Sequence, residues 1–137
     1  MKKVLVLCTG NSCRSQMAEA YLRYFAKDKA QIWSAGVDTH GVNKTAIAMM
    51  QEDGIDIASH TSNHIDEYQG IDFDFVITVC DNAQERCPYF PNQAKKIHQN
   101  FEDPSKVIGS EQEVLLSFRK VRQNIKNFCK QFVEEHL

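Results

Sequence analysis

The sequence lacks the features that would place the protein in a membrane, outside the cell or on nucleic acid. Its 137 residues contain no apolar run near the ~20 residues that span a bilayer. Too few apolar residues follow Met1, Lys2 and Lys3 to form a secretory signal peptide. A formal net charge of −2 leaves no basic surface for nucleic acid or an anionic membrane. No repeat, low-complexity tract or linker is visible, so we expect one cytoplasmic domain over residues 1–137, acting as a monomer.

Five cysteines are the unusual feature of a composition that is otherwise ordinary for a globular protein. A reducing compartment disfavours a structural disulfide framework, and an odd number of cysteines cannot pair completely. Several thiols in such a small chain therefore favour metal binding, catalysis or redox chemistry.

Short apolar segments alternate along the chain with segments of helical periodicity. The predicted strands cover residues 4–7, 31–37, 73–79 and 95–98, and the predicted helices cover 15–27, 44–53, 65–68, a brief segment after 81, and 111 to near the end. This alternation predicts a three-layer α/β fold, in which helices cover both faces of a four-stranded parallel sheet. Ligands of such sheets bind beyond the carboxyl ends of the strands.

The segment from Cys8 to Ser15 joins the first predicted strand to the first predicted helix. Gly10 and Asn11 tolerate positive φ, so the turn can direct successive backbone N–H groups into one concavity. Such a concavity at a helix N-terminus suits a tetrahedral oxyanion and is expected to lower the pKa of a thiol. The expected oxyanion loop comprises Thr9, Gly10, Asn11, Ser12, Cys13, Arg14 and Ser15.

Three residues of this segment are candidates for the chemistry itself. Cys8 is the candidate nucleophile, because a thiolate attacks and the loop can stabilise negative sulfur. The planar guanidinium of Arg14 matches two oxygens of phosphate or arsenate, and the Ser15 hydroxyl could stabilise the thiolate. Taken alone, Cys8 could simply be a buried cysteine and Arg14 an exposed arginine without a catalytic role. Their occurrence together in this loop favours catalysis.

Cys80 and Asp103 are expected on the same rim as Cys8. Cys80 ends the third predicted strand and Asp103 follows the fourth, so parallel strands would bring all three together. An aspartate there could protonate a leaving oxygen. The alternative is that Asp103 only forms a turn before Pro104.

Cys80 and Cys87 form a second pair of thiols, with six residues between them. Zinc ligands are usually separated by about two to four residues, so the spacing fits zinc poorly. A helix over residues 81–87 would hold their Cα atoms about 10 Å apart, although a disulfide needs about 7 Å or less. They can bond only if this segment unwinds, which Pro88 and a polar sequence make feasible. The position of Cys80 favours a redox role over two unrelated thiols.

The remaining thiols and the histidines predict no further site. Cys13 could be a redox neighbour of Cys8, although an apolar filler of the loop is the simpler interpretation. Cys129 falls on the apolar stripe of the last helix, which predicts a core thiol. The histidines form no metal-ligand pattern and are interpreted as structural or surface residues: His40, His60, His64, His98 and His136.

The motifs together resemble a known family. Cys8, Arg14 and Ser15 at the first strand–helix junction, with Asp103 and Pro104, resemble the low-molecular-weight protein tyrosine phosphatases, which have the phosphotyrosine phosphatase I fold. The sequence of residues 8–19 is more specifically similar to that of the thioredoxin-coupled arsenate reductases. Further similar segments span the chain: 34–36, 39–43, 60–62, 79–80 and 87–88.

The resemblance implies a mechanism for arsenate reduction in arsenic detoxification. Cys8 would attack arsenate held by the loop and Arg14, while Asp103 assists the departing oxygen. Cys80 would then attack Cys8, which releases arsenite and leaves a Cys8–Cys80 disulfide. Cys87 would next attack Cys80, and thioredoxin would reduce the resulting Cys80–Cys87 disulfide.

The resemblance also raises the question of a potassium ion beside the loop, as the one possible cofactor. Asn11, Glu19 and Ser34 match the potassium site of some members, but Asn63 stands where those members carry an aspartate. The loss of one carboxylate weakens a cation site.

Two other functions use the same residues. A phosphatase for phosphotyrosine or a small phosphomonoester would use Cys8, Arg14 and Asp103, with water hydrolysing a phosphocysteine. Such phosphatases carry tyrosines just after Asp-Pro, where this chain has Ser105 and Lys106, so the resemblance favours the reductase with weak residual phosphatase activity. A non-enzymatic thiol sensor or oxyanion-binding module would need neither Arg14 nor Asp103.

Overall fold

The computed structural model describes residues 1–81 and 94–137. Its elements in chain order are β1 (Lys2–Cys8), α1 (Arg14–Ala26), η1 (Lys27–Lys29), β2 (Ala30–Gly36), α2 (Lys44–Glu52), η2 (Ile65–Tyr68), β3 (Phe75–Thr78), β4 (Lys95–His98), η3 (Pro104–Lys106) and α4 (Glu111–His136). The predicted strands and helices are confirmed within one or two residues of their ends. The helical segment predicted after Asp81 lies outside the described residues.

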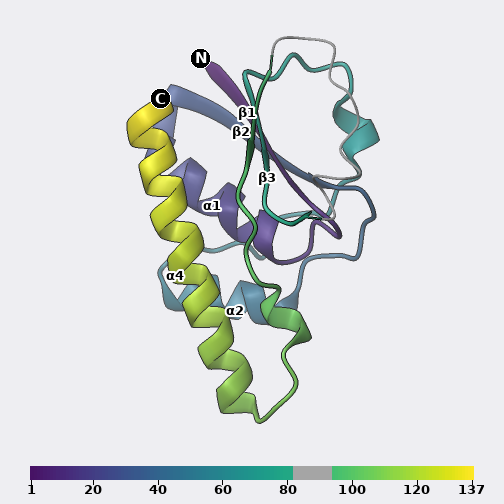
Figure 1. The fold of residues 1–137 in the computed structure, drawn as a ribbon, viewed down its shortest axis with the longest axis vertical. Helices are drawn as coiled ribbons and strands as arrows, with labels where there is room; N and C mark the ends of the chain where they lie inside the picture. The colour runs from purple at the N-terminus through teal and green to yellow at the C-terminus, as the bar shows by residue number, and fades with distance from the viewer. Residues whose placement is uncertain (82–93) are drawn as a thin grey trace.

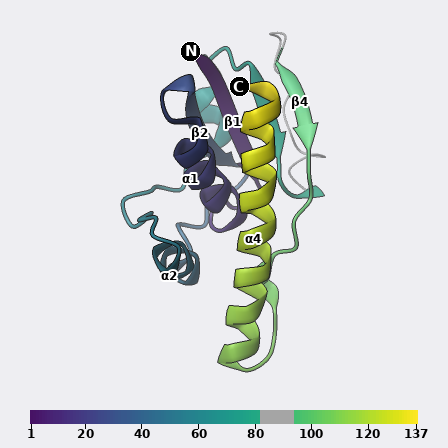
Figure 2. The same cartoon turned by 90° about the vertical axis from the view of Figure 1, so that its left-hand side faces the viewer.

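The four strands form one parallel sheet in the order β2-β1-β3-β4. Figure 1 shows α1 and α4 on one side of this sheet and the short helix η2 on the other. Figure 2 shows β4 at one edge of the sheet, beside α4. The predicted three-layer α/β fold is confirmed, and no described helix is long and apolar enough to cross a membrane.

Burial explains why β1 lies in the centre of the sheet. Its residues Val4 to Leu7 have no exposed surface, so apolar side chains on both faces of the strand are covered. Across one face, Phe75 of β3 packs edge-on against Phe132 of α4, with ring centroids 5.2 Å apart. Across the other face, Trp33 of β2 packs edge-on against Phe73, at 5.5 Å.

The long helix α4 is anchored by its apolar stripe and by charged contacts with α2. Cys129 is fully buried in this stripe, as predicted, and burial raises the pKa of its thiol. Glu52 of α2 accepts hydrogen bonds from Arg119 and Arg122. These two guanidinium groups lower the pKa of Glu52 to about 2, so the carboxylate stays charged at neutral pH.

Truncating the α4 stripe should destabilise the fold. Ile125 is fully buried, so Ile125→Ala should lower the free energy of unfolding by about 2–5 kcal/mol, through lost burial and a new cavity. Ile108→Ala is the matched control, because Ile108 is 98% exposed, and it should change this free energy by less than about 0.5 kcal/mol. Urea unfolding followed by circular dichroism measures both, and equal effects would contradict this account of the core.

Candidate active site

The loop between β1 and α1 has the shape of an anion-binding turn. Asn11 adopts a positive φ of 47°, as predicted, whereas Gly10 is not among the residues with positive φ. Gly10 is needed for space instead, because a Cβ at this position would lie 2.5 Å from Nδ1 of His40. The His40 backbone also donates a hydrogen bond to the Gly10 carbonyl, at 3.1 Å.

The side chain of Asn11 holds this loop from inside the protein. It is fully buried, and its Nδ2 donates to the hydroxyls of Ser15 at 2.8 Å and Ser34 at 3.0 Å. Its Oδ1 accepts from the backbone N–H of Asn63 at 2.8 Å. The fully buried Gln16 adds a second brace, donating from Nε2 to the Asn11 carbonyl at 3.0 Å. The side-chain amide of Asn11 thus connects the loop to α1, to β2 and to the segment before η2.

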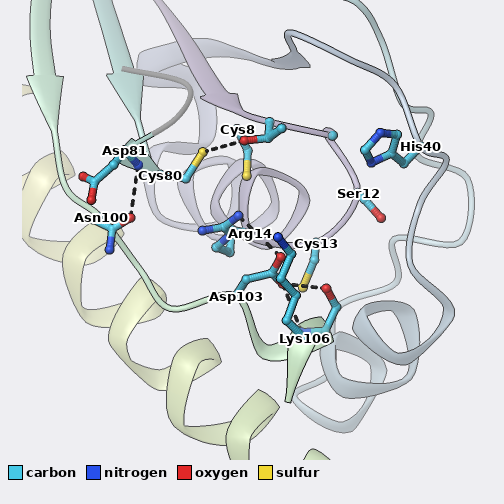
Figure 3. Close-up of a pocket in the computed structure, with 13 residues that line it drawn as sticks. Cys8, Ser12, Cys13, Arg14, His40, Cys80, Asp81, Asn100, Asp103 and Lys106 are labelled. Atoms are coloured by element: carbon cyan, nitrogen blue, oxygen red, sulfur yellow. Dashed lines mark hydrogen bonds and ion pairs between the residues drawn. The ribbon is translucent and has the colours of Figure 1, made fainter. Parts of the chain in front are cut away.

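The loop forms one wall of a cavity of about 470 Å³ that gathers most of the predicted site residues (Figure 3). Its lining residues are Cys8, Thr9, Gly10, Ser12, Cys13, Arg14, His40, Cys80, Asp81, Asn100, Asp103, Ser105 and Lys106. Cys87 lies outside the described residues. Asn11 and Ser15 are fully buried behind the loop and support it.

Arg14 and Asp103 face each other across the cavity, with Nη2 and Oδ2 3.6 Å apart. Arg14 also donates from Nη1 to the Phe101 carbonyl at 2.9 Å, which fixes the plane of the guanidinium. Asp103 accepts at Oδ1 from the backbone N–H of Ser105 at 3.0 Å and from its hydroxyl at 2.6 Å. Asp103 therefore forms the expected turn before η3 through Oδ1, while its Oδ2 faces Arg14; its role as a proton donor stays a prediction.

Cys8 and Cys80 meet at the carboxyl ends of β1 and β3, and each is only 3% exposed. The hydroxyl of Thr9 lies 3.2 Å from the Cys80 sulfur, which holds that side chain toward the loop (Figure 3). A hydroxyl in this position can donate to sulfur and stabilise its thiolate form.

The pKa of Cys8 is raised, contrary to the prediction from the loop. A hydrogen bond with the Cys80 side chain is the main cause, and burial adds to it. The positive charge of Arg14 and the backbone N–H of Thr9 oppose this rise without cancelling it. The prediction was wrong because it considered only the groups of the loop and left out the second thiol.

Cys13 behaves as the apolar filler that the sequence suggested. Its side chain is 5% exposed, and burial, followed by the charge of Asp103, raises its pKa to about 12. The thiol is therefore protonated at neutral pH.

Four further residues line the cavity although no site role was predicted for them: His40, Asp81, Asn100 and Lys106. Asp81 and Asn100 follow β3 and β4 closely, and Asn100 Oδ1 accepts from the Asp81 backbone at 3.2 Å. Polar residues just beyond parallel strand ends are a signal that could have identified these two.

The chain has relatives along nearly its full length. A family model described as low molecular weight phosphotyrosine protein phosphatase matches residues 3–137. An arsenate reductase of Bacillus subtilis (strain 168) is 42% identical over 133 residues, which cover 97% of this chain and 96% of the relative. A solved structure of an arsenate reductase in the phosphate binding state has a TM-score of 0.84 and 34% identity, with 98% of each chain covered.

A tyrosine phosphatase shares the architecture at lower identity. The solved structure of Wzb from Escherichia coli K30, in complex with sulphate, has a TM-score of 0.82 and 22% identity, covering 98% of this chain and 97% of that one. This likeness shows the fold alone.

Replacing the Cys80 thiol should lower the pKa of Cys8. In Cys80→Ser the new hydroxyl cannot ionise and can donate to the Cys8 thiolate, so the pKa of Cys8 should fall. The pH midpoint for alkylation of Cys8 by iodoacetamide, followed by mass spectrometry, should move to lower pH. Cys129→Ala, a change at the core thiol of α4, should leave the midpoint in place. A midpoint that stays fixed or rises in Cys80→Ser would contradict the assigned cause.

Proposed function

This chain belongs to the low molecular weight phosphotyrosine protein phosphatase family, and we propose that it acts there as a thioredoxin-dependent arsenate reductase. The observation that carries the proposal is the pairing of Cys80 with Cys8 inside an oxyanion loop. A hydrolytic phosphatase needs no second thiol at its nucleophile, whereas a reductase needs one to supply electrons. The identity of 42% to an arsenate reductase over nearly the whole chain supports the same conclusion.

The first step places arsenate in the loop, where backbone N–H groups and Arg14 face its oxygens. The raised pKa leaves Cys8 protonated, so a basic oxygen of arsenate takes this proton as the ion binds. The thiolate attacks arsenic and forms an S–As bond, while one oxygen departs as water with the help of Asp103. Asp103 Oδ2 lies 3.6 Å from Arg14 Nη2, and both residues line the cavity.

The second step transfers electrons to arsenic. The Cys80 thiolate attacks the Cys8 sulfur, an S–S bond forms, and the S–As bond breaks with its electron pair left on arsenic. Arsenic(V) becomes arsenic(III), and two thiols become one disulfide. In total, arsenic acid and two thiols give arsenous acid, a disulfide and one water.

The third step moves the disulfide away from the loop. A Cys87 thiolate attacks Cys80, which frees Cys8 and leaves a Cys80–Cys87 disulfide for thioredoxin to reduce. Support for this step comes from the sequence, since the two cysteines can bond only if the segment between them unwinds.

Hydrolysis of a phosphoester is the second candidate function, and the shared loop favours it as a side activity. Cys8, Arg14 and Asp103 would act as in the reductase. The rim, however, carries Ser105 and Lys106 in place of the aromatic side chains that would embrace a phosphotyrosine. The convergence of Arg14 and Asp103 on Cys8 argues against a thiol sensor without catalysis.

The residues that match the potassium site suggested by the resemblance make hydrogen bonds and an ion pair with their neighbours. Glu19 Oε1 accepts from the Ser34 hydroxyl at 2.5 Å, and Oε2 lies 3.1 Å from Nε of Arg23. Asn63 Oδ1 accepts from the Thr61 hydroxyl at 2.7 Å. Arg23 therefore already supplies a positive charge to the Glu19 carboxylate, and we route no step through potassium. Across residues 1–81 and 94–137, no group of three or more His, Cys, Asp or Glu side chains is arranged for a metal ion.

We further propose that the protein acts as a cytoplasmic monomer. Its large exposed apolar side chains are few within the described ranges: Met1, Tyr24, Val107, Ile108 and Leu116. A few exposed apolar side chains are ordinary on the surface of a monomer, whereas a stable interface needs an extended apolar patch. Size-exclusion chromatography of the purified chain would reject this proposal if the protein eluted as a dimer.

A coupled assay tests the reductase function directly. The purified protein, with arsenate, thioredoxin, thioredoxin reductase and NADPH, should consume NADPH only while arsenate remains. Phosphate in place of arsenate is the control, because it binds the same loop but accepts no electrons from a thiol. Hydrolysis of p-nitrophenyl phosphate without arsenate-dependent NADPH loss would identify a phosphatase instead.

The third cysteine should separate one turnover from many. Cys87→Ser should reduce about one equivalent of arsenate and then stop with a Cys8–Cys80 disulfide, because no thiol remains to move it. Mass spectrometry of the quenched protein identifies the linked peptides. Cys129→Ala should cycle normally, and continued cycling of Cys87→Ser with thioredoxin would disprove the relay.

A further inference from the structure

His98 joins two strand ends beside the active-site cavity but takes no part in the chemistry described above. It is the last residue of β4, and its register partner on β3 is Thr78. Its Nδ1 lies 2.7 Å from the Thr78 hydroxyl, and its Nε2 lies 2.7 Å from Oδ1 of Asp81. Asp81 immediately follows Cys80. His98, which lies outside the cavity, therefore binds the residue next to the second thiol.

The geometry of these contacts defines the direction of each hydrogen bond. Asp81 can only accept as a carboxylate, so the proton of the His98 ring resides on Nε2. Nδ1 of the neutral ring then accepts from the Thr78 hydroxyl, which is 6% exposed. The bond to Asp81 persists when the ring is protonated, because Nε2 donates in both forms.

Backbone contacts hold the chain on both sides of Cys80. On one side, the Val79 carbonyl accepts from the Phe101 N–H at 3.0 Å, and the Val79 N–H donates to Leu7 at 2.9 Å. On the other side, the Asp81 N–H donates to Asn100 Oδ1 at 3.2 Å (Figure 3). The His98 contact adds a side-chain tether at the point where the chain leaves the sheet.

From these contacts we infer that His98 is a positioning residue for the first disulfide exchange. By holding Asp81, it fixes the backbone of Cys80 so that the sulfur stays beside Thr9 and within reach of Cys8. This role rests on the proposed reductase function, since hydrolysis does not require Cys80. It also predicts a division of effects: His98 should matter for disulfide formation and not for attack by Cys8 on an oxyanion.

Three variants test the tether, each in a Cys87→Ser background that stops the reaction at the first disulfide. His98→Ala removes the ring, and Thr78→Val removes only the hydrogen bond that orients it. Asp81→Asn removes the carboxylate. Asp66→Asn is the matched control, because Asp66 also pairs with a histidine, at 3.3 Å, and its side chain is 71% exposed against 70% for Asp81.

The main measurement is the rate of Cys8–Cys80 formation after arsenate is added, by acid quench, alkylation and mass spectrometry. His98→Ala and Thr78→Val should lower this rate about tenfold, because small displacements of a reacting group are costly. Hydrolysis of p-nitrophenyl phosphate should stay within about twofold in His98→Ala and Thr78→Val, whose changed side chains lie outside the cavity, and this separates positioning from general damage to the fold. Rates equal to that of Asp66→Asn would overturn the inference.

A second measurement does not depend on arsenate chemistry. If Cys80 drifts from Cys8, the contact that raises the Cys8 pKa weakens, and the pH midpoint for alkylation of Cys8 should fall in His98→Ala. A protein that forms no disulfide with arsenate would refute the proposed function, and the midpoint alone would then decide the role of His98. A midpoint unchanged in both His98→Ala and Thr78→Val would overturn that role.

Discussion

The buried amide of Asn11 is the interaction on which the site depends. The loop needs one residue with positive φ, and the backbone there cannot be held by a regular helix or strand. Asn11 supplies both the conformation and the hydrogen bonds, to Ser15, Ser34 and Asn63. The position of Cys8 and the N–H groups that face an oxyanion follow from this anchor. The carboxylate of Glu19, held by Arg23, supports Ser34 from behind.

In the proposed function, the Cys80 thiol is the group that distinguishes arsenate reduction from phosphoester hydrolysis on the same fold. In the proposed function the loop, Arg14 and Asp103 would serve any tetrahedral oxyanion, and solved structures of an arsenate reductase and of a tyrosine phosphatase share the architecture of this chain. In the proposed reaction Cys80 would change the outcome, because a thiol can supply electrons to arsenic whereas water cannot. Its hydrogen bond to Cys8 also determines the protonation of the nucleophile, so the second thiol acts before any disulfide forms.

Periodicity and strand ends predicted most of the fold and the rim of the site. Continuous apolar segments identified the strands, and parallel strands necessarily bring Cys8, Cys80 and Asp103 to one edge. The predicted third strand, residues 73–79, is longer than β3 at both ends, and Phe73, just before β3, packs its ring against Trp33. The raised pKa of Cys8 and the hydrogen bond of His98 with Asp81 were not predictable from the sequence, since both depend on side-chain contacts between distant segments.

The contact of Cys8 with Cys80 has a consequence for the resistance of Cys8 to oxidation and alkylation. Peroxides and electrophiles react with thiolates far faster than with thiols. The buried Cys8 sulfur, whose pKa is raised by its contact with Cys80 and by burial, is therefore a poor target for such agents. In the proposed reaction, Cys8 becomes reactive when an oxyanion that can remove its proton binds in the loop. The contact between Cys8 and Cys80 would thus protect Cys8 from oxidation and alkylation, and the same contact would allow the disulfide to form in the proposed reaction.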